Sequence, residues 1–205
     1  MVKSKLIELL RGFSPKEWRA FSAYLHSPYF NRNEQLTCFG EWLAVRAPAF
    51  AEVGRTSAWK ALFGDAPFDD RALNHLMSQL LELAEGFIGQ ERYRADTVAA
   101  TLYTLDGLSR RGLDKHYRFI ADRLGDDLAQ SPLRDATHFY HAYRLHDLER
   151  AHFDRQGHRR LHDSAQMAAD SLDGFYLTEK LKYTCAMLNS QAVTTAPFHL
   201  HWLEE

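Results

Sequence analysis

Cysteine is scarce in this sequence, and several motifs that carry chemistry are absent. The 205 residues include two cysteines, Cys38 and Cys185. Each lies inside an apolar helical pattern, which predicts two buried, reduced thiols and no disulfide framework. A glycine-rich phosphate-binding loop and a Gly-x-Ser-x-Gly nucleophile elbow are also missing. These absences argue against nucleotide-binding enzymes and against hydrolases with a nucleophilic serine or cysteine.

Strand signals are missing as well. No Asn-Gly turn occurs, and no alternating run of β-branched residues extends for six positions. The hydrophobic residues, which make up 45% of the chain, instead recur at helical spacing. The sequence therefore predicts an all-α fold, in which a compact helical N-terminal subdomain is followed by stacked antiparallel helix hairpins.

The chain has neither an excess of one charge nor a long hydrophobic run. Lys and Arg number 25 against 27 Asp and Glu, so the net charge of -2 gives no general attraction to nucleic-acid phosphates or anionic lipid. The apolar stretch before Arg11 is too short for a signal-peptide core, and no later stretch reaches the length of a membrane span. We expect a cytoplasmic protein that stays outside the membrane and binds protein rather than nucleic acid. A homo-oligomer is compatible with the sequence.

Helix start and stop signals divide residues 1–93 into several short helices. Ser14 and Glu17 form a capping box around Pro15, which stands at the first helical position. The later predicted caps are Asn31 or Asn33, then Ser57, and then Asp69 or Asp70. The polar stretch 90–96 is predicted to be the joint to the second subdomain.

Residues 94–205 are predicted to form successive antiparallel helix pairs. The expected helices cover about 96–111, 113–130, 132–155, 161–169 and 175–188. Asp96 is the predicted cap of the first, and Ser131 with Pro132 is predicted to start the third. A further amphipathic pattern begins after Pro197 and indicates either a longer helical array or a surface that packs against a partner.

The second subdomain resembles tetratricopeptide-type and related α-solenoid repeats, in which helix pairs stack side by side. The residues behind the resemblance are Gly107, Ala121, Leu124, Pro132 and the small Ala165, Ala168 and Ala169. When Pro132 is placed at the terminal proline of the repeat, the glycine and small alanine positions fall on Leu108 and Ile120. The resemblance implies stacked helices that bind protein. The whole chain also resembles uncharacterised bacterial helical proteins through its Ser-Pro-x-Glu start and the motif from Phe175 to Leu181, which implies no function.

Histidine, which could bind a metal through a side-chain nitrogen or act in acid–base chemistry, is enriched in this sequence. The chain has eleven histidines, and seven of them lie from His116 to His162. Two pairs have a spacing that places imidazoles on one helix face, namely His138 with His141 and His158 with His162. A metal site also needs a third ligand and an outer carboxylate, for which Asp135, Asp147 and Asp163 are the available candidates without any recognised motif. We therefore predict chance spacing, with no metal or cofactor site, and a half-buried helix position for His146.

Charged and aromatic clusters have simpler explanations than function. The basic spots are Arg110, Arg111, Lys115 and Arg118, and Arg155 with Arg159 and Arg160. They lie near predicted helix ends, where cations offset the helix dipole. The acidic pairs at 69–70, 126–127 and 204–205 are expected to be solvated. The rings of Tyr29 and Phe30, in a turn after Pro28, are expected to pack into the core.

The sequence thus favours a non-catalytic protein-interaction scaffold, with no catalytic residue and no particular partner-binding residue assigned. One alternative is a nucleic-acid-associated regulator whose first part is helix-turn-helix-like. That alternative predicts a positive face formed by Lys16, Arg19, Arg32 or Arg46. The other alternative is a histidine-rich metal-dependent enzyme, which requires three converging ligands.

Overall fold

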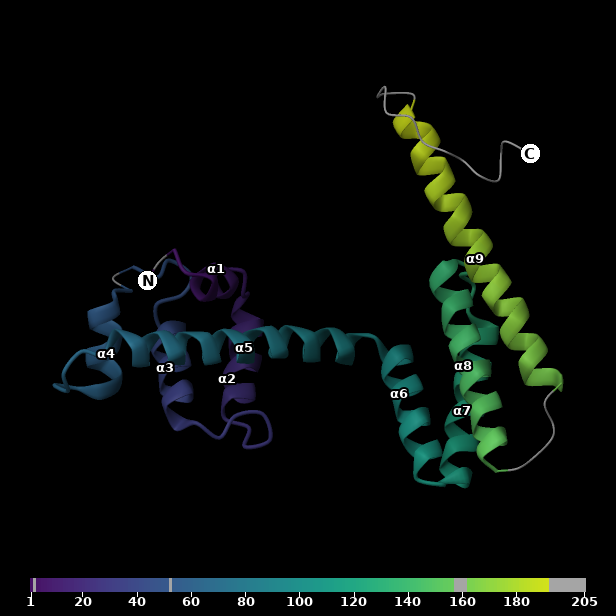
Figure 1. Ribbon diagram of the computed structural model, residues 1–205, viewed down its shortest axis with the longest axis horizontal. Helices are drawn as coiled ribbons and strands as arrows, with labels where there is room; N and C mark the ends of the chain where they lie inside the picture. Colours follow the sequence, from purple (N-terminus) through teal and green to yellow (C-terminus); the bar gives the residue numbers. More distant parts are fainter. Residues whose placement is uncertain (2, 52, 157–161, 192–205) are drawn as a thin grey trace. The chain divides into compact units, whose positions relative to one another are not determined.

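The computed structural model describes residues 1, 3–51, 53–156 and 162–191 (Figure 1). Over these residues the fold is all-α, as predicted, and contains no strand. The chain divides into two compact units, residues 1–95 and 96–205. Each unit has its own hydrophobic core.

The first unit contains five helices. They are α1 (Lys5–Arg11), α2 (Pro15–Leu25), α3 (Glu34–Ala44), α4 (Arg55–Phe63) and α5 (Asp70–Ala95). Helix α5 contacts each of the other four helices, which pack along its first part (Figure 1). Its buried face runs from Leu73 to Phe87, and the rings of Phe13 and Phe21 pack against Phe87 at centroid distances of 5.5 and 5.3 Å. Aromatic burial therefore supplies much of this core.

The start of α2 is the capping box that the sequence predicts. The Ser14 Oγ accepts a hydrogen bond from the Glu17 backbone N–H at 3.3 Å, and the Glu17 carboxylate accepts one from the Ser14 N–H at 2.8 Å. Asn33 is the cap of α3, since its side chain accepts from the Gln35 N–H. The prediction that Ser57 caps α4 is wrong. Helix α4 begins earlier, with Gly54 as its N-cap, and Ser57 lies in its first turn.

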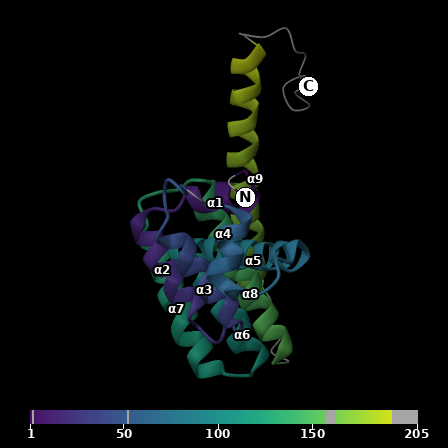
Figure 2. The ribbon, with the colours of Figure 1, turned by 90° about the vertical axis from the view of Figure 1, so that its left-hand side faces the viewer.

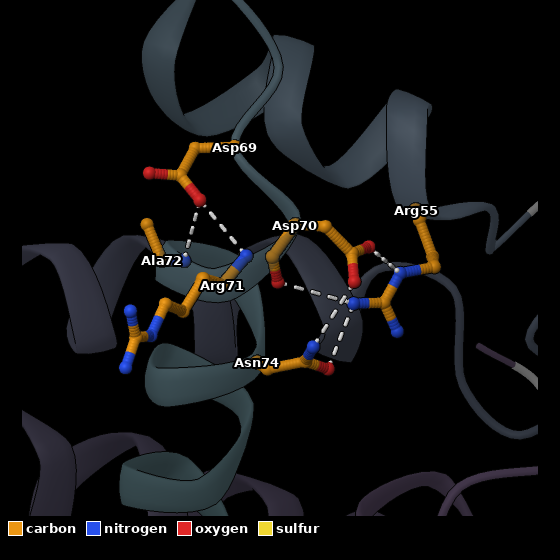
Figure 3. Close-up of polar contacts among 6 residues, drawn as sticks. All are labelled: Arg55, Asp69, Asp70, Arg71, Ala72 and Asn74. Carbon is orange, nitrogen blue, oxygen red and sulfur yellow. Dashed lines mark hydrogen bonds and ion pairs between the residues drawn. The ribbon is translucent and has the colours of Figure 1, made fainter.

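The start of α5 is fixed by two aspartates with different roles (Figure 3). Asp69 is the cap, because its Oδ1 accepts from the N–H groups of Arg71 and Ala72 at 2.8 and 3.0 Å. Asp70 instead binds the Arg55 guanidinium at 2.7 Å and so joins the start of α4 to the start of α5. The Arg55 side chain also donates to the side-chain oxygen of Asn74.

The polar stretch 90–96, which the sequence predicts to be the joint between the subdomains, is helical up to Ala95. Helix α5 continues through it to Ala95, and Asp96 immediately caps the next helix by accepting from the Ala99 N–H at 2.9 Å. The boundary between the units therefore falls between two directly consecutive helices. The polar composition of the stretch reflects an exposed helix surface.

The second unit contains four described helices. They are α6 (Thr97–Arg110), α7 (Asp114–Gln130), α8 (Ala136–Arg155) and α9 (His162–Gln191). Helix α8 packs against the other three, while α9 packs against α8 alone (Figure 1). The core between α6, α7 and α8 is formed by Leu102, Leu105, Tyr117, Ala121, Leu124, Leu145 and Leu148.

Two predictions about this unit are wrong. Ser131 ends α7 rather than starting α8, which begins at Ala136 with the Asp135 side chain accepting from the His138 N–H. The two helices expected over 161–169 and 175–188 are a single helix of 30 residues. The described helices consequently do not show a tetratricopeptide-type repeat.

Helix α9 extends beyond α8, as both views show (Figures 1 and 2). Phe139 and Tyr140, near the start of α8, meet Gly174 and Phe175 in the middle of α9. Many apolar side chains of α9 are therefore exposed, namely Met167, Leu172, Tyr176, Leu177, Leu181, Tyr183 and Leu188. Among the described helices, none combines the length and the hydropathy that crossing a membrane requires.

Candidate functional site

A groove runs between α7 and α8 in the second unit. Its main hollow has a volume of about 570 Å³. The apolar lining consists of Ala121, Gly125, Leu128 and Ala129 on α7, Ala142 and Leu145 on α8, and Met167 on α9. Because α9 packs on α8 and makes no contact with α7, the space over this part of α8 stays open between them.

The groove continues along α7 into a second hollow of about 550 Å³. The two hollows share Ala121, Asp122 and Glu149, and the second is also lined by Tyr117, Arg118, His152 and Phe153. From Tyr117 to Ala129 the wall follows α7 for roughly 18 Å, at about 1.5 Å of rise per residue. We call the two hollows together the α7–α8 groove.

Small residues on α7 leave room for the groove. Ala121, Gly125 and Ala129 are spaced one helical turn apart and so share a face. A Cβ atom added at Gly125 would lie 3.9 Å from the nearest Leu145 side-chain atom, which is ordinary contact. A Cβ atom is therefore accommodated at Gly125, and we expect a larger side chain there to enter the hollow that Gly125 lines.

Charged side chains border the groove unevenly. Asp122 and Asp126 are exposed on the α7 side, and neither forms an ion pair or a side-chain hydrogen bond with another described residue. On α8 the Glu149 carboxylate lies 3.0 Å from His146 Nδ1, and the His146 side chain is half-buried, as predicted. At one end the Arg134 guanidinium donates to the carbonyl oxygens at the end of α7. The middle of the groove is consequently acidic.

A buried polar cluster stands at the other end of the groove. His152 is 1% exposed, and its ring stacks on Tyr117 with centroids 3.8 Å apart. The His152 Nδ1 lies 2.8 Å from the Ser109 hydroxyl, which also accepts from the Arg155 guanidinium at 2.6 Å. Because Ser109 comes from α6, Tyr117 from α7 and His152 from α8, the cluster ties three helices together.

Hydrogen bonding defines the proton position on His152. The Gln156 amide NH₂ donates to Nε2 at 3.0 Å, so Nε2 accepts and the proton lies on Nδ1, which donates to Ser109. Burial lowers the pKa of His152, although the Asp114 carboxylate, 3.6 Å from Nε2, opposes the shift. His152 is therefore mostly neutral near pH 7, and its contact with Asp114 is no ion pair in the neutral state. Burial also raises the pKa of Tyr117, whose hydroxyl has no hydrogen-bond partner among the described residues.

The cluster contains a serine, a histidine and an aspartate, but its geometry is that of a structural clamp. A nucleophilic serine must donate its proton to the imidazole and face the substrate. Here Ser109 accepts from His152 and from Arg155, and the residue is 6% exposed. The arrangement holds α6, α7 and α8 in register and so shapes the end of the groove.

His138 and His141, the predicted pair that lies within the described residues, do not form part of a metal site. Burial lowers the pKa of His138, and the Arg134 guanidinium, 2.7 Å away, lowers it further. In the described part of the chain, no three His, Cys, Asp or Glu residues are grouped closely enough to hold a metal ion. His158 lies outside the described residues, and so do Arg159, Arg160 and the pair at 204–205.

The predicted basic and acidic clusters mostly form local contacts. Arg110 pairs with Asp106 at 2.8 Å, and Arg111 donates to the Gly107 carbonyl. In the first unit the cations of the helix-turn-helix hypothesis act similarly: Arg19 and Arg32 donate to nearby proline carbonyls, and Arg46 lies over the Trp42 ring. These contacts explain the side chains without a nucleic-acid ligand.

Four side chains that were expected to be buried are exposed. Tyr29 is 86% exposed and Phe30 is 38% exposed, although Phe30 stacks on Tyr24 at 4.2 Å. The turn that carries them is held by Asn31, whose side chain donates to the Leu25 carbonyl at 2.8 Å. Cys38 and Cys185 are free thiols, as predicted, but both are exposed. They lie on the solvent side of α3 and α9, whose other faces make the helix contacts.

Comparisons of the chain with protein-family models, with curated proteins and with solved structures found no match. Sequence reasoning did not find Asp122, Gly125 or His152 as candidates. The turn-by-turn spacing of Ala121, Gly125 and Ala129 is visible in the sequence, whereas nothing in it indicates that α9 leaves that face uncovered.

Proposed function

We propose that the protein is a non-catalytic interaction module, and that its second unit binds a segment of a protein partner in the α7–α8 groove. The observation that carries the proposal is the elongated groove itself, whose floor is apolar and whose borders are charged. Protein-binding surfaces combine an apolar centre with a polar rim in this way. The length of the groove, roughly 18 Å along α7, corresponds to about three turns of a bound helix.

A helix is the best-suited form of the bound segment. The groove is lined by side chains of helices, and the described residues contain no strand edge to which an extended peptide could hydrogen-bond. A helical segment satisfies its own backbone N–H and C=O groups, whereas an extended one would bury them unpaired. The small residues Ala121, Gly125 and Ala142 allow the backbone of such a helix to approach closely.

Affinity capture from cells of the source organism with a groove-filling variant tests the proposal. Gly125→Leu should keep α7 folded, because leucine favours helix over glycine by roughly 0.5–1 kcal/mol. Its side chain would occupy the groove beside Leu145. Gly89→Leu is the matched control, since a Cβ at Gly89 on α5 meets nothing within 4 Å.

We expect a protein that is captured by the wild type and by Gly89→Leu, and that is lost with Gly125→Leu. Capture of the same proteins by all three chains, with circular dichroism showing equal helix content, would contradict the proposal.

A further inference from the structure

The charges beside the α7–α8 groove restrict the kind of helix that fits it. Asp122 and Asp126 lie one helical turn apart on the α7 border, both exposed and without an ion pair to another described residue. Glu149 faces the same hollow from α8, where its side chain is 26% exposed. Three carboxylates therefore surround the middle of the groove.

Two cations, Arg118 and Arg134, border the groove, against the three carboxylates Asp122, Asp126 and Glu149. Arg134 borders the main hollow, but its guanidinium donates to the Leu128 and Ala129 carbonyls at 3.0 and 2.9 Å. Arg118 borders the second hollow at the other end. Arg118 lies one helical turn from Asp122 and offsets part of its charge, but the three carboxylates outnumber the two guanidinium groups, so the lining keeps a net negative charge.

The apolar part of the lining sets a second requirement. Ala121, Gly125 and Ala142 are small, so the partner must supply bulky side chains to fill the space above them. Met167, which is 48% exposed, is the flexible contact on the opposite wall. Methionine at a binding surface adapts to side chains of different shape.

We infer that the α7–α8 groove selects a basic amphipathic helix, with bulky apolar residues facing the groove and Lys or Arg one turn apart opposite Asp122 and Asp126. This inference rests on the proposed function and names the class of partner for the same site. Exposed ion pairs contribute little affinity individually, so the apolar stripe supplies most of the binding and the charges supply selectivity.

Two designed peptides of about 14 residues, each about four helical turns, test the inference on the full-length protein. Both carry the same leucine stripe, and the flanking positions are Lys in one and Glu in the other. Fluorescence anisotropy should show the Lys peptide binding at least roughly ten-fold more tightly, given two or three exposed pairs and the like-charge penalty on the Glu peptide. The advantage should shrink as salt is added.

Charge reversal at the border provides the decisive variant. Asp122→Lys combined with Asp126→Lys should reverse the preference to the Glu peptide. Asp65→Lys combined with Glu85→Lys changes the net charge equally at exposed positions of the first unit and should leave the preference for Lys unchanged. Gly125→Leu should weaken the binding of both peptides.

The outcomes separate the inference from the proposed function. If the two peptides bind equally well and Gly125→Leu abolishes the binding of both, the inference of charge selection is wrong, whereas the groove remains the binding site. Binding of the Lys peptide that Gly125→Leu does not weaken would place that peptide elsewhere and contradict both. If neither peptide binds, the basic-helix inference is wrong, and the capture experiment decides about the groove.

Discussion

Individual polar residues in the interior determine local geometry in both units. Asn31 holds the turn after α2 with its amide, which donates to the Leu25 and Asn33 carbonyls and to the Thr37 hydroxyl. His152 does the same between three helices, with hydrogen bonds at both ring nitrogens. Buried polar groups stabilise a fold only when they are paired, so the loss of one partner leaves the others unsatisfied.

Protonation of His152 is expected to destabilise the second unit. Burial lowers the pKa of His152 in the fold below its ordinary value of 6.5, so the unfolded chain takes up the proton first as the pH falls. The contribution of His152 to the free energy of unfolding is therefore largest above pH 6.5 and declines below it, down to the folded-state pKa. His138, whose pKa is also lowered, adds a change of the same sign.

Midpoints of urea unfolding, measured from about pH 5 to about pH 7.5, check this expectation. This range extends to both sides of the ordinary histidine pKa. His152→Asn, which keeps a donor for Ser109 and cannot titrate, should flatten part of the pH dependence, and His138→Gln should remove a further part. A wild-type slope in His152→Asn would show that the buried imidazole is not the titrating group.

Residue types alone could not predict which side chains are exposed. Asn33, Asp96 and the box of Ser14 and Glu17 act through neighbours in the sequence, and these caps were predictable. The exposure of Tyr29 and Cys185 depends on which face another helix covers. That information lies in the packing of distant segments.

At the scale of helices, close approach between α8 and α9 explains why α9 is continuous. The missing Cβ of Gly174 is what allows α8 to approach α9. A Cβ atom there would lie 2.6 Å from the nearest Phe139 ring atom. Tertiary contact thus overrides the low helix propensity of glycine, which is about 1 kcal/mol less favourable than alanine.

Alanine substitutions at two helical glycines should have opposite effects. Gly174→Ala must displace Phe139 and is expected to cost roughly 1–3 kcal/mol through overpacking. Gly125→Ala has room beside Leu145 and is expected to stabilise by roughly 0.5–1 kcal/mol through helix propensity. Chemical denaturation of both variants measures the difference. Equal stability changes would show that α9 does not pack on Phe139 as described.

At the scale of the whole molecule, the chain has two separate hydrophobic cores, one in each unit. The first core is built around α5 and the second between α6, α7 and α8, and each draws its buried residues from one unit. The all-α fold was predictable because helical periodicity is a local signal. The groove was not, because it arises from the packing of α9 on α8 alone.

The central claim is that the α7–α8 groove binds a protein segment, and photo-crosslinking inside source cells tests it most directly. A benzophenone amino acid at position 122 should form a discrete adduct with a partner protein, and adding Gly125→Leu should abolish that adduct. The same amino acid at position 89, on the exposed surface of α5, should form none. The account is contradicted if position 122 gives no adduct, or if the adduct persists when the groove is filled.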